Sequence, residues 1–221
     1  MNHVKFAAAL LVFLFVGALP AQADAPKTLF EMAGVKLEPA KLSDSVLVIV
    51  DAQREYVDGA LPLSGVREAI AETAQLLKRA RKSGTPVIHI VHKGRTGSLF
   101  DPAGKYFDIV SALHPQEGEP VIEKMRVSAF AGTGLEEAIQ RTGRKNLIIV
   151  GFMTHNCISS TSRAARDLGY APTIVAAATA TRDLPDGKGG TIPASTLQAA
   201  SLAALADRTA TVVTFERAIL E

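Results

Sequence analysis

Apolar strand-like runs alternate along the chain with stretches of helical periodicity, and this alternation limits the possible folds more than any other feature. The first run, Val46 to Val50, is apolar at every position, as is typical of a strand buried on both faces. Further runs of this kind are Pro86 to Val91, Leu147 to Val150, Thr173 to Ala176 and Thr211 to Thr214. Such strands belong to parallel sheets with helices on both faces.

Helical stretches separate these strands. Apolar residues recur at intervals of three or four from Val66 to Leu77, an Ala- and Arg-rich stretch ends near Leu168, and a further helix is expected from about Ala194 to Ala206. Right-handed crossovers place a helix over each pair of parallel strands. The pattern therefore predicts an α/β fold, a three-layer sandwich with a mostly parallel sheet.

The first 23 residues have the character of a targeting segment. Lys5 is their single formal charge, Phe6 to Leu19 is nearly all apolar, and Ala21-Gln22-Ala23 fits the small-residue cleavage rule. The apolar run is shorter than the ~20 residues that a membrane-spanning helix needs. We therefore expect a cleaved signal peptide over residues 1–23, with an uncleaved anchor as the alternative. Residues 24–221 would then be one exported domain, periplasmic or secreted, without membrane association.

Charge and cysteine content narrow the function. The formal net charge is +2, from 24 basic and 22 acidic residues without long runs of either sign. This balance argues against a nucleic-acid partner and favours a small-molecule substrate. Cys157 is the only cysteine, so no internal disulfide can form. A solitary thiol in an oxidising compartment is either buried and inert or has a chemical task.

Two reactive side chains follow predicted strands. Asp51 comes directly after Val50, and Cys157 lies seven residues after Val150. Ligands of parallel sheets bind beyond the carboxyl ends of the strands, so Asp51 is a candidate general base and Cys157 a candidate nucleophile. With Asn156 as N-cap, a helix starting at Cys157 would favour the thiolate. The alternatives are a turn-capping Asp51 and a Cys157 that packs as a small apolar residue.

Lys124 ends a short extended segment, Val121 to Lys124. Taken alone, Lys124 is weak evidence for a functional site, because most lysines are solvated surface charges. Beside the two residues above, its ammonium group would lower the pKa of the thiol and keep the carboxylate ionised.

The order of these segments resembles the isochorismatase-like cysteine hydrolase superfamily, which includes nicotinamidases, N-carbamoylsarcosine amidohydrolases and isochorismatases. The resemblance extends from about Ser45 to the C-terminus. The matching segments are Asp51 with Gln53, Lys124 with Ser128-Ala129-Phe130, Gly151 through Cys157 and on to Tyr170, and Ala178 through Asp183.

The resemblance implies a six-stranded, mostly parallel Rossmann-like sheet that carries an Asp51-Lys124-Cys157 triad. It also implies a non-proline cis peptide between Phe152 and Met153, an oxyanion hole made by the N–H groups of Met153 and Cys157, and a homo-oligomer. In the implied mechanism the thiolate attacks a carbonyl and forms a thioester. We therefore predict an exported amidohydrolase that cleaves a C–N bond. The alternatives are an isochorismatase-type vinyl-ether hydrolase and a non-catalytic binding or thiol redox protein.

No metal or other cofactor is expected. Nicotinamidases carry an Asp-x-His motif after the second strand, whereas here His89 and His92 are three residues apart in a strand and face opposite sides. Five side chains are candidates for binding substrate, with Arg95 as a partner for a carboxylate, although each could equally be a structural or solvated side chain. They are Gln53, Phe130, His92, Arg95 and His155.

Two loops stand out. The irregular segment from Lys93 to Glu119 follows the second strand and is expected to be a lid, a binding loop or only a surface excursion. The Gly-rich stretch from Asp186 to Gly190 lacks the spacing of a phosphate loop and is predicted to be a flexible turn.

Overall fold

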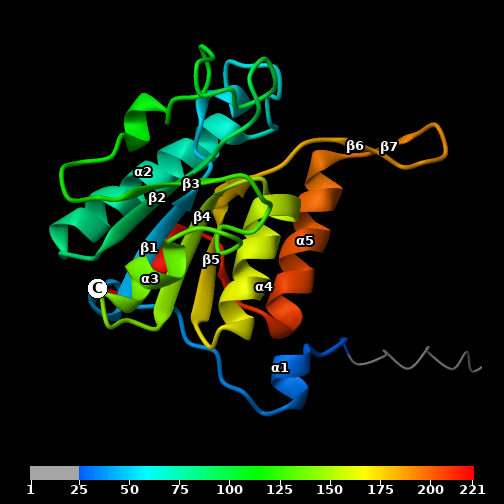
Figure 1. Cartoon of the computed structure of the whole chain (residues 1–221). Helices are drawn as coiled ribbons and strands as arrows, with labels where there is room; N and C mark the ends of the chain where they lie inside the picture. Colours follow the sequence, from blue (N-terminus) through cyan, green and yellow to red (C-terminus); the bar gives the residue numbers. More distant parts are fainter. Residues whose placement is uncertain (1–24) are drawn as a thin grey trace, which may run out of the picture.

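The computed structural model describes residues 25–221 and has a six-stranded sheet at its centre (Figure 1). The predicted signal peptide, residues 1–23, lies outside the described residues. The strands of this sheet are β1 (Ser45–Val50), β2 (Val87–His92), β3 (Val121–Lys124), β4 (Asn146–Phe152), β5 (Ala171–Ala180) and β8 (Thr211–Val213).

All neighbouring strands of the sheet run parallel, in the order β3-β2-β1-β4-β5-β8. From β1 the chain first builds β2 and β3 on one side and then β4, β5 and β8 on the other. The order therefore reverses between β1 and β4. In open α/β sheets such a switch point leaves a crevice at the carboxyl ends of the two strands.

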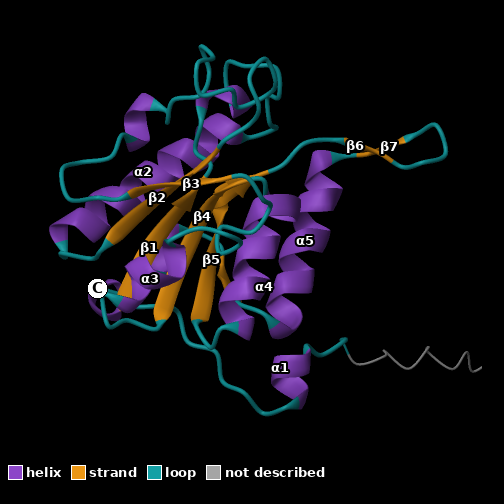
Figure 2. Cartoon of the chain, in the orientation of Figure 1, coloured by secondary structure: helices purple, strands orange, loops and turns teal. Residues whose placement is uncertain are grey.

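Helices cover both faces of the sheet (Figure 2). The helix α2 (Val66–Lys82) packs on one face, and α3 (Leu135–Gln140), α4 (Ser159–Asp167) and α5 (Ala194–Arg208) lie on the other. The short α1 (Leu29–Met32) docks on α5, where Leu29 N–H donates to Asp207 Oδ1 at 2.8 Å. The predicted three-layer α/β sandwich is confirmed.

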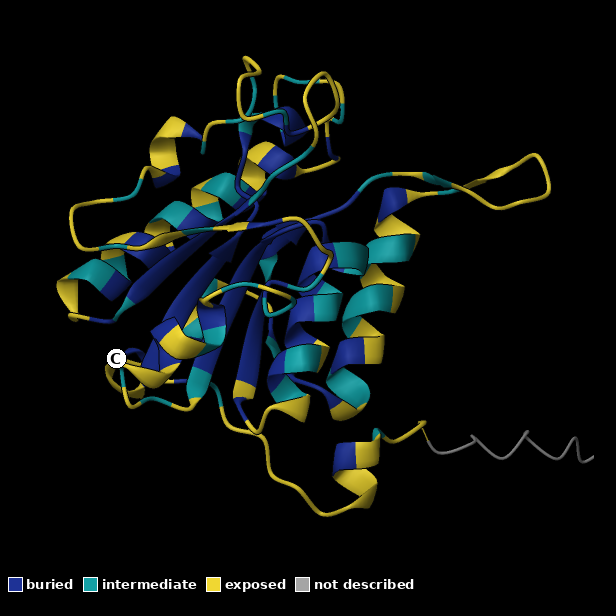
Figure 3. Cartoon of the chain, in the orientation of Figure 1, coloured by how far each residue is buried: buried dark blue, intermediate teal, exposed yellow. Residues whose placement is uncertain are grey.

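The sheet is the buried part of the molecule (Figure 3). Every residue of β1 is buried, and its side chains alternate between the two faces. Leu47 and Ile49 join the core under α2, while Val46 and Val48 join the core under α3 and α4. A strand that must satisfy two apolar cores has no place for an exposed polar position, which explains its continuous apolar sequence.

Both predicted loops are loops in the structure. The segment from Lys93 to Glu119 contains only the 3-10 turn η3 (Ser111–Leu113). The Gly-rich stretch is the turn between β6 (Leu184–Pro185) and β7 (Thr191–Ile192), an antiparallel hairpin that projects from the body (Figure 1). The other short turns are η1 (Leu42–Asp44), η2 (Arg54–Tyr56), η5 (Glu216–Ala218) and the π-helical η4 (Thr154–Ile158).

Within residues 25–221, none of the helices combines the length and the apolar character that crossing a bilayer requires.

Candidate active site

The structure brings Asp51, Lys124 and Cys157 together at the carboxyl ends of β1, β3 and β4. The Lys124 Nζ atom lies 2.8 Å from Asp51 Oδ2 and 3.3 Å from Cys157 Sγ. Their exposed fractions are 0% for Asp51, 1% for Lys124 and 3% for Cys157. An acidic group, a cation and a thiol are thus held in contact with almost no water around them.

Local backbone features at the switch point set the position of Asp51. Its φ angle is 51°, in the left-handed region that non-glycine residues rarely occupy. Gly151 of β4 lies beside Val50 with a φ of 112°, and a Cβ atom there would come within 2.0 Å of Val50 O. The close approach of β4 to the end of β1 therefore requires glycine at position 151.

The loop that contains Cys157 begins with a cis peptide between Phe152 and Met153, as the family resemblance implies. The π-helical turn η4 follows and contains Cys157, and α4 begins only at Ser159. The expectation that Asn156 caps a helix starting at Cys157 is wrong. Asn156 lies inside the π turn, where its N–H donates to Met153 O at 3.0 Å.

Burial dominates the electrostatics of the thiol. Burial and the negative charge of Asp51 raise the pKa of Cys157 to about 12, and the opposing effect of Lys124 is smaller. Lys124 lowers the thiol pKa as expected, but burial and the charge of Asp51 outweigh it, and the sequence pattern does not reveal how completely the sulfur is buried. The raised pKa favours the thiol, with its proton, over the thiolate.

The carboxyl group of Asp51 is the natural acceptor for that proton. Burial raises the pKa of Asp51, although the charge of Lys124 opposes the shift. Both carboxylate oxygens of Asp51 are buried and have no donor in normal hydrogen-bond geometry among residues 25–221, yet Asp51 and Cys157 are near enough to perturb each other's pKa. A buried carboxylate with raised proton affinity and a free lone pair suits a general base.

Lys124 has two further partners. Its Nζ atom lies 3.0 Å from His92 Nδ1 and 3.1 Å from the carbonyl oxygen of Arg126. Burial and the neighbouring charge of Lys124 lower the pKa of His92 to about 4, so its imidazole is neutral at physiological pH. Of the five candidate substrate-binding side chains, His92 is the one that contacts the triad directly.

Gln53 lies fully buried next to this cluster. Its Nε2 donates to the carbonyl oxygens of His92 at 3.0 Å and Phe107 at 2.8 Å, and its Oε1 accepts from His92 N–H at 2.8 Å. Both amide hydrogens are therefore used by the backbone. In this geometry Gln53 joins the ends of β1 and β2, and its side chain is not part of an open pocket wall.

The remaining three candidates lie apart from one another. Phe130 is half-buried and stacks on Tyr170 with ring centroids 6.0 Å apart. His155 forms a short hydrogen bond with the Thr181 hydroxyl, and burial together with the charge of Arg182 lowers its pKa. Arg95 is exposed in the loop after β2.

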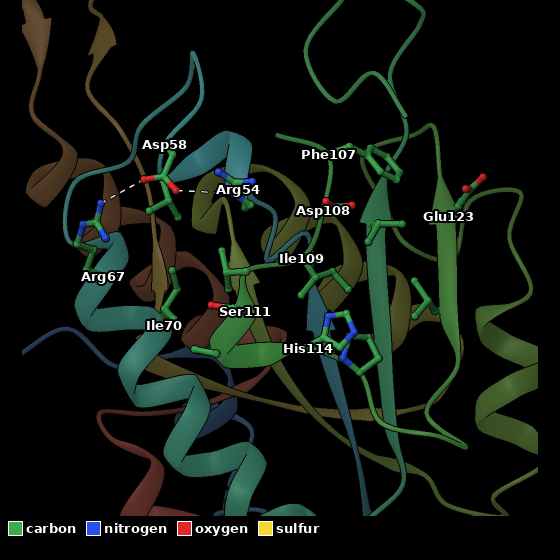
Figure 4. A pocket seen from close by; sticks show the side chains of 16 residues that line it. Arg54, Asp58, Arg67, Ile70, Phe107, Asp108, Ile109, Ser111, His114 and Glu123 are labelled. Atoms are coloured by element: carbon green, nitrogen blue, oxygen red, sulfur yellow. Dashed lines mark hydrogen bonds and ion pairs between the residues drawn. The ribbon is translucent and has the colours of Figure 1, made fainter. Parts of the chain in front are cut away.

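Two hollows lie near this edge of the sheet. One, of about 640 Å³, is lined by His92 and Arg95 together with Phe100 and Met125, and adjoins the triad through His92. The other, of about 920 Å³, lies on the α2 side between that helix, the 107–115 loop and β3 (Figure 4). None of the triad residues lines either hollow.

Two aromatic side chains of the site were not foreseen. Tyr56 is buried with its ring against Phe152, at a centroid distance of 5.9 Å, and burial together with the charge of Asp51 raises its pKa. Phe100 has a φ of 60° and contacts both Tyr56 and His92, with ring centroids 5.1 and 5.2 Å apart. Nothing in the local sequence distinguishes these two from ordinary core aromatics.

Metal-binding side chains do not cluster in residues 25–221, where no group of three or more His, Cys, Asp or Glu could hold an ion. His89 points to Glu119, with Nε2 and Oε2 3.0 Å apart, while His92 faces Lys124.

The fold and the site together define an α/β protein in which a carboxylate, an ammonium group and a thiol meet at the switch point of a parallel sheet. Residues 45–217 match the family model described as the isochorismatase domain. The chain belongs to this family and is a hydrolase. The resemblance inferred from sequence is confirmed.

Individual relatives agree with this family assignment. The chain is 36% identical over 183 residues to a secreted isochorismatase effector of Verticillium dahliae, covering 82% of this chain and 94% of that protein. It is 30% identical to a streptothricin hydrolase of Streptomyces noursei, covering 73% of this chain and 59% of that protein. The crystal structure of an isochorismatase from Pseudomonas putida KT2440 superposes with a TM-score of 0.85 at 45% identity, covering 89% of this chain and all of that one.

Proposed function

We propose that this hydrolase is an exported enzyme that cleaves a C–N bond of a small amide through a thioester on Cys157. The observation that carries the proposal is the contact of Lys124 Nζ with both Asp51 Oδ2 and Cys157 Sγ, at 2.8 and 3.3 Å, inside a buried site. A buried charge pair is costly to maintain, and such sites concentrate where chemistry requires them.

The chemistry begins with proton transfer. Asp51 takes the proton of the Cys157 thiol, and the thiolate attacks the carbonyl carbon of the amide. The N–H groups of Met153 and Cys157 receive the oxyanion, and Lys124 balances the negative charge that moves through the site. Asp51 then gives its proton to the departing amine as the C–N bond breaks.

Hydrolysis of the thioester completes the cycle. Asp51 removes a proton from water, the hydroxide attacks the thioester carbon, and the C–S bond breaks to release the acid. The proton on Asp51 returns to sulfur. The raised proton affinities of both Asp51 and Cys157 support this exchange, because neither group must give up a proton to bulk water.

Substrate contacts are assigned within the same proposal. His92 and Arg95 line the hollow of about 640 Å³ beside the triad, where Arg95 would meet a substrate carboxylate. Phe130 and His155 would act from the surrounding walls, and Gln53 would support the site from behind by fixing the backbone of His92. The substrate is a small molecule, and no cofactor takes part in the scheme.

Export is supported by two separate observations. Residues 1–23 have the composition of a signal peptide, and a relative in Verticillium dahliae is described as secreted. Mass spectrometry of protein recovered from the periplasm or medium should give a mature N-terminus at Asp24. A chain retained in the cytoplasm with residues 1–23 intact would contradict export. Size-exclusion chromatography of the same sample tests the homo-oligomer that the resemblance implies.

The activity test is a screen of small amides with the mature protein, with release of ammonia or amine as the readout. We expect turnover by the wild type, a covalent acyl-enzyme detectable by intact mass, and no turnover by Cys157→Ala with an unchanged circular dichroism spectrum. Turnover of a vinyl ether without amine release would favour the isochorismatase-type reaction. A reactive thiol without any acyl-enzyme or turnover would favour a binding or redox protein.

A further inference from the structure

The ammonium group of Lys124 has more acceptors around it than hydrogens to donate. Four acceptors surround Nζ, namely Asp51 Oδ2 at 2.8 Å, His92 Nδ1 at 3.0 Å, Arg126 O at 3.1 Å and Cys157 Sγ at 3.3 Å. An ammonium group carries three N–H bonds. The contacts with hydrogen-bond geometry are those to His92 Nδ1, Arg126 O and Cys157 Sγ, and they account for all three N–H bonds. Asp51 Oδ2 faces the ammonium as an ion-pair partner without hydrogen-bond geometry.

The proton transfer changes the charge of the sulfur that accepts the third N–H of Lys124. Before transfer the negative charge is on Asp51 and the sulfur is a neutral thiol. After transfer the S–H bond is broken, an O–H bond has formed on Asp51, and the charge is on sulfur. The N–H that points to Sγ then meets a thiolate in place of a thiol, and this charge-assisted hydrogen bond is stronger while the other two N–H bonds keep the ammonium in place.

His92 is suited to hold one of those two N–H bonds. Lysine can only donate, so Nδ1 of His92 must carry no proton and the ring is the Nε2–H tautomer. The lowered pKa of His92, about 4, agrees with a ring that stays an acceptor. Besides Lys124, no other charged group of the described chain contributes to this shift.

The imidazole ring is itself fixed from two directions. Gln53 binds both the N–H and the carbonyl of His92, so the backbone at the end of β2 cannot turn. Phe100 packs edge-on against the ring at a centroid distance of 5.2 Å. Phe100 reaches this position through a left-handed backbone, with a φ of 60°, which is unusual for an aromatic residue.

We propose that His92 is a positioning residue that anchors the Lys124 ammonium through Nδ1, so that one N–H stays directed at Cys157 Sγ as the thiolate forms. The inference rests on the proposed function of Cys157 as nucleophile. It assigns to His92 an effect on thiolate formation that does not require contact with substrate.

Alkylation of the only cysteine by iodoacetamide, followed by intact mass at pH 7, reports thiolate formation without a substrate. His92→Phe keeps a ring for Phe100 but removes the acceptor, whereas His92→Asn keeps an acceptor at the position of Nδ1 but removes the ring. We expect His92→Phe to slow alkylation about tenfold to a hundredfold, which corresponds to a lost charged hydrogen bond. His92→Asn should stay within about threefold of the wild type, by restoring that bond.

Controls separate the possible failures. His114→Phe makes the same substitution at an exposed histidine and should alkylate as the wild type does. Equal rates for His92→Phe and wild type, or equal losses for the Phe and Asn variants, would overturn the role of His92. Melting curves identify a variant that fails to fold. If His92→Phe fails to fold, the alkylation rate of the soluble His92→Asn variant decides alone. Amide turnover that survives Cys157→Ala would instead reject the proposed function.

Discussion

The two hollows at this edge of the sheet show that size and chemistry are separate properties. The larger, of about 920 Å³, has charged side chains that remain in water (Figure 4). Asp58 lies there 3.3 Å from Arg67 and 3.8 Å from Arg54, with side-chain exposures of 46%, 74% and 35%. The ion pair of the triad beside the smaller hollow has 0% exposure on both partners.

Burial determines how strongly the charges of these ion pairs interact. Exposed pairs are screened by water and contribute little. Buried pairs interact strongly, and they move the pKa values of Asp51 and Cys157 far from their ordinary ranges. The comparison teaches that the size of a hollow does not locate the buried charges, because the triad residues line neither hollow and adjoin the smaller one only through His92.

The largest effect on stability should follow from removing the central cation. Lys124→Met leaves Asp51 buried without its ion-pair partner, and such losses cost about 3–5 kcal/mol. Urea unfolding at pH 7 measures the change. Lys124→Met unfolding at the wild-type midpoint would mean that the triad charges are better solvated than the structure indicates.

The next effect concerns the backbone that brings the triad together. Gly151→Ala places a Cβ within 2.0 Å of Val50 O at a φ of 112°. We expect a loss of about 2–4 kcal/mol, together with slower alkylation of Cys157, because β1 and β4 must separate. Gly65→Ala is the matched control, since its φ is 70° but a Cβ there meets nothing within 4 Å. Equal losses at both positions would show that close approach is unimportant.

A third charge cluster provides an intermediate case. Burial raises the pKa of Glu119, but hydrogen bonds from Arg81, Gln116 N–H and His89 outweigh it and lower the pKa to about 2, against an ordinary value of 4.5. The resulting stabilisation is complete above pH 4.5 and is lost as the pH falls through about 2. Glu119→Gln should cost about 2 kcal/mol at pH 7 and nothing near pH 2, as measured by melting curves across that range.

The smallest effect should come from the exposed pair. Asp58→Asn removes both ion pairs of Asp58 in the larger hollow, and we expect less than about 1 kcal/mol in stability. Alkylation of Cys157 should keep its wild-type rate. A large loss in either measurement would place the larger hollow in the chemistry and break the comparison.

Much of the fold followed from local pattern. The continuous apolar run at Val46 to Val50 predicted a doubly buried strand, and the position of Asp51 directly after it predicted a carboxylate at the sheet edge. The Lys124 segment carried no such signal. Lys124 gained support as a candidate from the family resemblance. Its contact with Asp51 depends on the strand order, in which β3 lies at the edge of the sheet next to β2.

The rest depended on contacts that no local pattern records. Gln53 matched a family position, but its amide is used by the carbonyl oxygens of His92 and Phe107, which are distant in sequence. The direction of the Cys157 pKa shift depends on complete burial, which spacing cannot reveal. The π-helical turn moved the start of α4 past the position where Asn156 would have capped it.

The most direct test asks whether Asp51 and Cys157 titrate as one unit. In the wild type, alkylation of Cys157 should keep rising beyond pH 10, because its pKa is about 12 rather than about 8.5 as in an ordinary thiol. Asp51→Asn removes the negative charge that raises this pKa, so the rate profile should move to lower pH by on the order of one unit, while amide turnover is lost. Superimposable profiles for the two proteins, with a midpoint near that of a free thiol, would contradict a buried carboxylate–ammonium–thiol site.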